Sequence, residues 1–359
     1  SDVYKRQPFG RLAMFPCRDG VTCETPRGLA LRGAQLFCDS LNSFALDEAS
    51  LHVPARAPEN KVFLVAANKI GPLIPAELLQ AVSEQTHIPL KFLHGAGESQ
   101  IVAPDGEVLA RGPRAEEAVV WADLDLGLAE DKSRPDGTDL WAARRPELYG
   151  PIVREPTGPV CATVTEPVQV ACLAPQSGGA AALEELTSLV AALPVNTRLA
   201  VLPELFCFEN VCADDLAAAT ALSQIALERL QQSCAIRPGL LLATSRVMPV
   251  AGGHQLTAVL VSDSGLVAQQ PQLHRSARHS WSIPGADLGP VDLPWGKLGL
   301  ICGDDAAFPE LIKVAALQGV HAIAVPFEVQ ERWEQRYGLP SRAAENRMCV
   351  VASSRLRDG

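Results

Sequence analysis

The stretch Lys297–Leu311, "KLGLICGDDAAFPEL", contains the residue types of a thiol-based active site. A short apolar run leads to Cys302, two acids follow in a bend, and Phe-Pro-Glu opens a helix. A cysteine attacks as the thiolate, and a free thiol with a pKa of roughly 8.5 is mostly protonated at neutral pH. A catalytic cysteine here would therefore need a nearby base. The pattern alone leaves open whether Cys302 is a nucleophile or an ordinary buried thiol.

An internal repeat relates this stretch to the N-terminal part of the chain. A shift of 286 residues aligns 10–69 with 296–355 without a gap, and fifteen of these 60 positions are identical. The clearest match is "RAPENKVFLVAANK" against "RAAENRMCVVASSR". In this register Cys17 aligns with Gly303, and Cys302 lies one position away. Because neighbours on a strand point to opposite faces, a pocket-facing Cys17 predicts that Cys302 faces the core.

The elements that must position these residues follow from the apolar pattern. Apolar runs of four to seven residues alternate with helical patterns, which predicts an α/β fold built of layered helices and sheets. A strand is expected in 168–175, an amphipathic helix in 180–194, and a second strand that ends at Glu204. A helix with two acids in its first turn is expected in 213–233. The segment "GPIVREPTGPVCATVTE", rich in Pro, Gly and Thr, predicts a linker between two domains.

Composition excludes several classes of partner. The chain has 31 Lys and Arg against 41 Asp and Glu, a net charge of -10 and no basic run, which argues against nucleic acid. Its apolar runs are shorter than the roughly 20 residues of a membrane helix. The ten cysteines lack the CxxC pairs of a metal site and the density of a disulfide scaffold, which favours reduced thiols in the cytoplasm. No cofactor is expected, because "HGAGES" precedes a strand rather than linking a strand to a helix.

Four elements, in order, resemble the nitrilase or carbon-nitrogen hydrolase superfamily. They are "AVLPELF" with Glu204, "GRLAMFPCRDG" with its degenerate counterpart "GKLGLICGDD", the "RAxEN" segments, and a closing "GESQIVAPDGEVLARG" that leads to "RRPELY". The resemblance implies a four-layer αββα sandwich, present as one partial C-terminal half-domain and a second, nearly complete domain. We expect residues 1–7 to be an artefact or scar, 8–149 the C-terminal half of a first carbon-nitrogen hydrolase domain, 150–166 a linker, and 167–359 a second such domain that lacks its C-terminal part. The chain would then be a fragment of a tandem protein.

The resemblance also implies a chemistry, the cleavage of a nonpeptide carbon-nitrogen bond in an amide, carbamoyl or nitrile compound. A cysteine thiolate attacks the carbon, a glutamate transfers the proton, and a lysine stabilises the oxyanion. Carried over to this chain, Cys17 is the nucleophile of the first copy and Glu204 is the general base of the second. In the second copy Gln272 stands where the lysine is expected, and no acid replaces the accessory glutamate between Ser264 and Asp287. We therefore expect the second copy to be non-catalytic.

Replacements for the missing groups were considered in the second copy. Arg275 or Arg278 could supply positive charge, although a guanidinium differs in geometry from an ammonium. His274 and His279 suggest a Cys-His pair with Cys302, but loop histidines beside a core thiol are the favoured interpretation. If strands of the two copies pair, Cys17 could approach the glutamate of the second copy.

Two functions from different classes remain open. The first is a hydrolase that acts on a small-molecule amide or nitrile through a Cys17 thioester in the full-length parent, with a second domain that does not catalyse. The alternative is a non-catalytic binding or regulatory scaffold built from two degenerate domains. Because members of the family associate through a two-fold contact, we expect either a homo-oligomer or an intramolecular pairing of the two domains.

Overall fold

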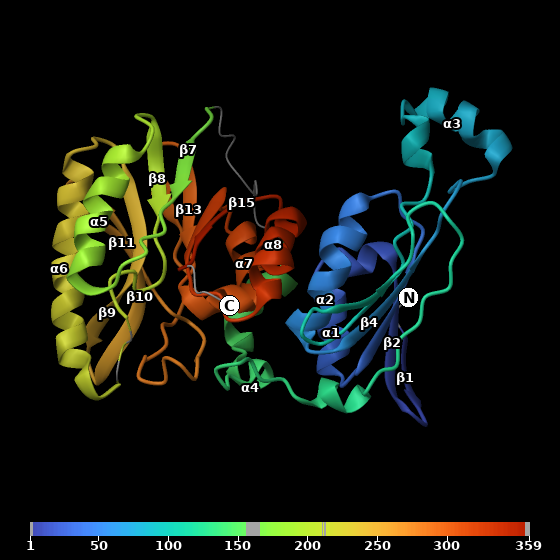
Figure 1. Cartoon of the computed structure of the whole chain (residues 1–359), viewed down its shortest axis with the longest axis horizontal. Helices are drawn as coiled ribbons and strands as arrows, with labels where there is room; N and C mark the ends of the chain where they lie inside the picture. The colour runs from blue at the N-terminus through green and yellow to red at the C-terminus, as the bar shows by residue number, and fades with distance from the viewer. Residues whose placement is uncertain (1–2, 156–165, 210, 212, 356–359) are drawn as a thin grey trace. The chain divides into compact units, whose positions relative to one another are not determined.

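The chain forms two compact units, each with an α/β fold and mixed sheets (Figure 1). The computed structural model describes residues 3–155, 166–209, 211 and 213–355. Unit 1 comprises Ser1–Ser133 and Glu331–Ser341, and unit 2 comprises Arg134–Gln330 and Arg342–Gly359. The predicted α/β class is confirmed by strands and helices that alternate along both units.

The units divide the chain at other places than the expected domains. Residues 134–149, which we placed in the first domain, belong to unit 2, and Glu331–Ser341, which we placed in the second, belongs to unit 1. The heptad that we set aside contains strand β1 (Val3–Gln7), which pairs antiparallel with β2 (Gly10–Pro16). Of the expected linker, residues 156–165 lie outside the described part of the chain.

Unit 1 is built on one six-stranded sheet in the order β1-β2-β3-β4-β5-β6. Strands β2, β3 and β4 are parallel, so their carboxyl ends meet at one edge, and the other neighbours are antiparallel. One face of this sheet is buried. A row of residues that crosses four strands on this face has 0% exposure at every position: Ala13, Phe37, Leu64 and Val102. The further elements are β3 (Leu36–Leu41), β4 (Phe63–Asn68), β5 (Gln100–Val102), β6 (Val108–Arg111), α1 (Glu24–Leu31), α2 (Val53–Asn60) and α3 (Leu79–Thr86).

Helix α2 has local signals at both ends. Pro54 lies in its first turn, where a proline costs no helical hydrogen bond. Lys61 follows its last residue in the left-handed conformation, with φ of 48°. The segment Glu331–Ser341 packs on this helix, with Trp333 and Tyr337 against Ala55 in a buried cluster.

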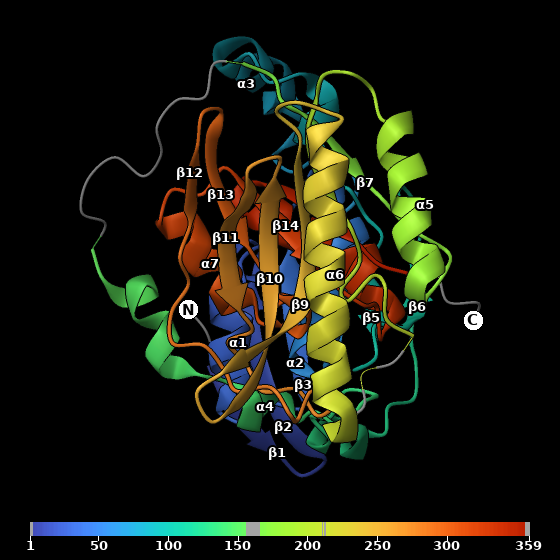
Figure 2. The ribbon, with the colours of Figure 1, turned by 90° about the vertical axis from the view of Figure 1, so that its left-hand side faces the viewer.

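Unit 2 contains two sheets, in the orders β11-β10-β9-β8-β7 and β12-β13-β14-β15. Apolar residues of both sheets share one core, and the long helix α6 lies across β9 and β10 (Figure 2). The first sheet comprises β7 (Gln169–Cys172), β8 (Thr197–Val201), β9 (Leu241–Val250), β10 (Gly253–Ser262) and β11 (Gly265–Pro271). The second comprises β12 (Val291–Leu293), β13 (Gly296–Leu300), β14 (Ala322–Pro326) and β15 (Cys349–Ser353). The helices are α4 (Leu140–Ala143), α5 (Gly179–Ala192), α6 (Leu216–Ala235), α7 (Pro309–Leu317) and α8 (Leu339–Asn346), the last beginning in unit 1.

Elements that the 286-residue shift aligns have the same type and similar bounds. Helix α8 begins and ends 286 residues after α2, and β13, β14 and β15 begin 286 residues after β2, β3 and β4. Backbone conformations also agree at the turns. Cys17 and Gly303 have φ of 37° and 52°, and Lys61 and Arg347 have φ of 48° and 50°.

Candidate functional site

Cys17 lies at the edge of the unit 1 sheet where the parallel strands end. It follows directly on β2, opens a short 3-10 turn (Cys17–Gly20) and has a left-handed backbone with φ of 37°. Residues other than glycine pay for this conformation, and such strain gathers at functional sites. The side chain is half-buried. The turn therefore presents a thiol at the carboxyl edge of the sheet, where α/β proteins commonly bind ligands.

The Cys17 thiol lies beside carboxylates. Its Sγ atom is 3.8 Å from Oε1 and 4.0 Å from Oε2 of Glu48. Burial raises the pKa of the thiol, a backbone hydrogen bond from Asn42 opposes this shift, and the charge of Glu48 adds to it. Burial also raises the pKa of Glu48, and it raises the pKa of Asp39 to about 8 with a contribution from Glu48. The site as described therefore holds its thiol in the protonated form at neutral pH.

The "RAxEN" motif of unit 1 holds the turn that follows Cys17. Arg56 is fully buried, and its Nη1 atom donates to both carboxylate oxygens of Glu59 at 2.8 and 2.9 Å. Its Nε and Nη2 atoms donate to the carbonyl oxygens of Gly20 and Val21, each at 2.8 Å. These interactions of the guanidinium balance its charge and fix the backbone three and four residues after the thiol. The motif positions the turn rather than contacting the thiol.

In unit 2 the aligned position is occupied by a glutamate from another element. Glu204 follows β8, is 3% exposed, and places its Oε2 atom where a Cβ atom on Gly303 would lie. Arg278 forms an ion pair with it, with Nη1 at 2.7 Å from Oε1. Burial raises the pKa of Glu204 because the charge of Arg278 only partly offsets the loss of solvation. Glu204 and Arg278 therefore fill the space that a cysteine would need at position 303.

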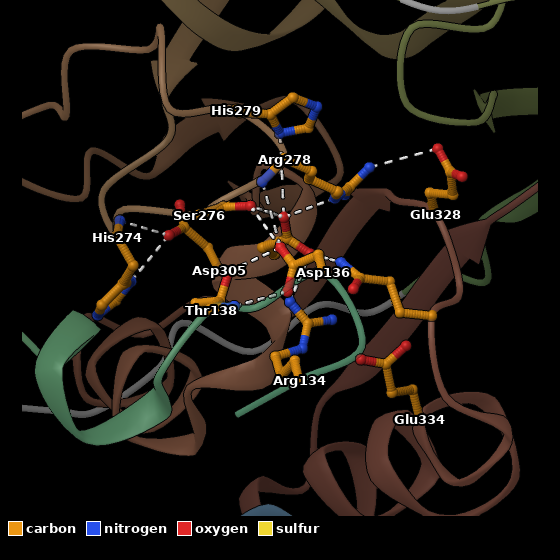
Figure 3. A network of polar contacts seen from close by, with 12 residues as sticks. Arg134, Asp136, Thr138, His274, Ser276, Arg278, His279, Asp305, Glu328 and Glu334 are labelled. Carbon is orange, nitrogen blue, oxygen red and sulfur yellow. Dashed lines mark hydrogen bonds and ion pairs between the residues drawn. The ribbon is translucent and has the colours of Figure 1, made fainter. Parts of the chain in front are cut away.

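Asp304 is the centre of a buried network around this pair. Figure 3 shows its partners Arg134, Ser276 and Arg278. Its Oδ2 atom accepts from Arg278 Nε at 2.8 Å and from Ser276 at 2.6 Å. Its Oδ1 atom accepts from Arg134 at 2.7 Å and from Gln330 at 2.9 Å. Burial opposes the charge of Asp304, yet the two guanidinium groups hold its pKa below the usual range. The carboxylate is thus saturated by partners, which leaves no room for a substrate on it.

His279 lies beside Glu204 at the edge of this network. Its Nε2 atom is 3.4 Å from Oε1 of Glu204. Burial and the charge of Arg278 lower its pKa to about 4, so the imidazole is neutral at pH 7. A cavity of about 280 Å³ lies beside it, lined by polar side chains that include Thr138, Ser276 and Ser280.

The structure places the other candidates of the second copy apart from this network or at its margin. Cys302 is 0% exposed within the apolar core, and burial raises the pKa of its thiol well above the ordinary value. Gln272 is buried but donates its backbone amide to Leu256 in the adjoining strand. Arg275 is exposed, so Arg278 is the arginine that supplies charge in the pocket. His274 contacts Asp305 at 2.8 Å rather than pairing with Cys302.

The two predicted catalytic residues lie in different units. Cys17 belongs to unit 1 and Glu204 to unit 2. In the described part of the chain, strands β1–β6 pair only among themselves, so the pairing of strands between the two copies that we considered is not seen. Each residue is therefore interpreted within its own unit.

Sequence reasoning missed several residues that surround the two positions. Glu48 and Asp39 lie beside Cys17, and Arg134 and Asp304 form a buried ion pair in unit 2. Glu48 carried a signal, because it is one of the fifteen positions identical in the repeat. The ion pair carried none, since its partners are 170 residues apart.

The described ranges contain neither a candidate metal site nor a candidate membrane-spanning helix. His, Cys, Asp and Glu side chains in the described ranges do not form a group of three that could hold a metal ion. None of the helices found there combines the length and apolar composition that crossing a bilayer requires.

The first part of the chain is similar to known proteins. Residues 2–133 match the carbon-nitrogen hydrolase family. A nitrilase from Pyrococcus abyssi is 33% identical over 141 residues, which are 39% of this chain and 47% of that protein. An N-carbamoylputrescine amidase from Solanum tuberosum is 30% identical over 152 residues, 39% of this chain and 46% of that protein. The chain thus spans about half the length of the curated relatives it matches.

Solved structures of the nitrilase superfamily are also similar to the chain. An amidase from Nesterenkonia sp. has a TM-score of 0.46 at 22% identity, covering 52% of this chain and 76% of that one. A protein from Saccharomyces cerevisiae that belongs to branch 10 of the nitrilase superfamily has a TM-score of 0.47 at 21% identity. The match covers 55% of this chain and 79% of that one.

Proposed function

We propose that residues 2–133, which match the carbon-nitrogen hydrolase family, belong to a protein whose full-length form hydrolyses amide, carbamoyl or nitrile compounds through a Cys17 thioester. The observation that carries this proposal is the backbone of Cys17. A thiol on a left-handed turn, at the carboxyl edge of a sheet and fixed by Arg56, matches the requirements of a presented nucleophile.

The proposed reaction balances in two steps for an amide. The Cys17 thiolate forms a bond to the carbonyl carbon, the carbon-nitrogen bond breaks, and the nitrogen leaves as ammonia or an amine with the thiol proton. Water then attacks the thioester, which releases the carboxylic acid and restores the thiol. In the full-length parent, the glutamate and the lysine that the family resemblance implies would accept the thiol proton and stabilise the oxyanion.

The partial-domain layout is part of this proposal, and the second face of the unit 1 sheet supports it. Met14, Cys38 and Val65 form one row on that face, where Met14 is 51% exposed and the other two are only half-buried. The residues 286 positions later are buried in the core that joins the two sheets of unit 2: Leu300, Ala324 and Val351 are 1%, 0% and 4% exposed. We infer that a complete first domain covers this row with a second sheet, as in a four-layer αββα sandwich.

Unit 2 is proposed to be a non-catalytic copy that arose by duplication. The shared bounds and shared left-handed turns of the aligned elements support duplication. Gly303 removes the nucleophile, Gln272 stands where the lysine is expected, and Glu204 is held by Arg278. A glutamate committed to a buried ion pair beside a glycine has no thiol to deprotonate.

The test is ammonia release from a panel of aliphatic amides, carbamoyl compounds and nitriles by the full-length parent. Cys17→Ala should abolish release, and Cys302→Ala should leave it within about twofold, because Cys302 lies in the core. If Cys17→Ala hydrolyses the panel at the native rate, the assignment of the nucleophile is wrong.

The second candidate function is a binding or regulatory scaffold. The raised pKa of Cys17 and its carboxylate neighbours favour it, since they oppose formation of a thiolate. A parent that binds amides of the panel without releasing ammonia, equally in the native form and in Cys17→Ala, would establish the scaffold and reject the hydrolase.

A further inference from the structure

We propose that the site around Asp304 and the loop that carries Arg278, next to position 303 of unit 2, is a receptor for a segment of the chain itself, residues 134–149, here called the strap. The strap has the sequence "RPDGTDLWAARRPELY" and belongs to unit 2. This inference rests on the proposed non-catalytic role of unit 2 and gives its pocket a task. The ligand chemistry is a peptide that presents a guanidinium, a carboxylate and a hydroxyl two residues apart, Arg-x-Asp-x-Thr.

The first anchor is the ion pair between Arg134 and Asp304. The two atoms are 2.7 Å apart, and each side chain is 3% exposed. In the 286-residue register Asp304 aligns with Arg18, which is exposed in unit 1. The second copy thus has the opposite charge at the position that follows the vacancy. This reversal creates the acceptor that the strap arginine requires.

The second anchor is a set of hydrogen bonds to the loop that carries Arg278 (Figure 3). Asp136 accepts from the Ser276 hydroxyl at 3.2 Å and from the backbone amide of Arg278 at 3.3 Å. The Thr138 hydroxyl accepts from the backbone amide of Ala277 at 2.8 Å. The strap therefore forms hydrogen bonds with both a side chain and the backbone of this loop, as a bound peptide does.

The third anchor is the distal end of the strap. Arg145 donates to the carbonyl oxygens of Leu273 and Gly285 at 2.8 and 2.6 Å. The Tyr149 hydroxyl lies 2.7 Å from Nε2 of His274, whose Nδ1 atom lies 2.8 Å from Asp305. Arg144 adds an ion pair with Glu310 at 3.0 Å. Polar contacts thus hold the strap at both ends, at 134–138 and at 144–149.

The strap is connected to the vacated site through one carboxylate. Asp304 holds Arg134 on Oδ1 and Arg278 on Oδ2, and Arg278 in turn holds Glu204. Binding of the strap therefore orders the arginine that keeps Glu204 over Gly303. Release of the strap should loosen this arginine and open the pocket.

Hydrogen exchange of the full chain tests the proposal. We expect the amides of 134–149 to be protected in the native protein, and Arg145→Ala and Tyr149→Phe to reduce that protection at least about tenfold. Arg134→Ala and Asp304→Asn should do the same, but Tyr149→Phe keeps the ring and is the safeguard against loss of folding. Arg198→Ala, an exposed arginine of unit 2, is the matched control and should change nothing.

A synthetic peptide with the sequence of 134–149 provides an independent readout. It should bind the Arg134→Ala/Arg145→Ala chain, whose pocket has lost its own occupant, and not the native chain. An unprotected strap in the native protein, or equal binding of the peptide to both chains, would overturn the proposal. Neither readout involves hydrolysis, so failure of the strap and failure of Cys17 as a nucleophile are distinguishable.

Discussion

Glu204 and Gly303 share one space in unit 2, because the Oε2 atom of Glu204 lies where a Cβ atom on Gly303 would be. Gly303 also has a left-handed backbone with φ of 52°. The two residues are 99 positions apart and come from the two sheets that form the core of the unit. The Glu204 carboxylate thus occupies the space that a side chain at position 303 would need.

Gly303→Ala should therefore destabilise unit 2. Overlap with a buried side chain costs about 1–3 kcal/mol, and a left-handed alanine adds about 1–2 kcal/mol. In a Glu204→Ala background only the backbone part should remain. Urea unfolding of the four proteins of this double-mutant cycle measures the difference, and an equal cost in both backgrounds would refute the overlap.

Glu48→Gln should make the Cys17 thiol more reactive. Removing a negative charge about 4 Å from sulfur lowers the pKa of the thiol and raises the thiolate fraction at pH 8, by about three- to tenfold. The measurement is the rate of iodoacetamide labelling at Cys17 by peptide mapping. Glu77→Gln, an exposed glutamate of unit 1, should leave the rate unchanged. Slower labelling in Glu48→Gln would mean that Glu48 assists the thiol as a base.

Asp39→Asn should change how the stability of unit 1 depends on pH. The folded pKa of Asp39 is raised from 3.8 to about 8, so the native state binds more protons than the unfolded state between these values. The contribution of Asp39 to the free energy of unfolding is fully present below about pH 4. It is lost as the pH rises through the folded pKa of about 8, and each unit of pKa shift corresponds to about 1.4 kcal/mol.

The Asn variant lacks that loss, so it should gain stability relative to the native protein from pH 4 to pH 8 and hold the gain above pH 8. Melting temperatures across this range check it. Asp123→Asn, an exposed control in unit 1, should follow the native curve. A native curve that rises between pH 5 and pH 8 more than that of Asp39→Asn contradicts the raised pKa.

Arg56→Ala should destabilise unit 1 and loosen the turn after Cys17. It removes the guanidinium charge that balances the buried Glu59 carboxylate, which costs about 3–5 kcal/mol, and it removes the Arg56 hydrogen bonds to the carbonyl oxygens of Gly20 and Val21. Hydrogen exchange at residues 17–21 and urea unfolding report the two effects. Arg6→Ala, exposed on β1, is the control. Native-like exchange in the turn of a folded Arg56→Ala protein would show that the motif does not position it.

The sequence predicted the α/β class, and it predicted that Gly303 rather than Cys302 aligns with Cys17. Both predictions depend on patterns along the chain. The repeat register alone placed Cys17 and Gly303 at equivalent turns. It could not show that Glu48 lies against Cys17, since the two are 31 residues apart and meet only when the parallel strands align. Strand β1 was missed because its polar residues lie at a sheet edge, where no buried face imposes alternation.

The thioester on Cys17 is the most direct test of the proposed chemistry. The full-length parent would be mixed with a small amide, quenched in acid within milliseconds to seconds, and mapped by peptide mass spectrometry. The account predicts an acyl adduct on the peptide that contains Cys17, absent in Cys17→Ala, with Cys302 unmodified. An adduct on any other residue during turnover, with Cys17 free, would contradict it.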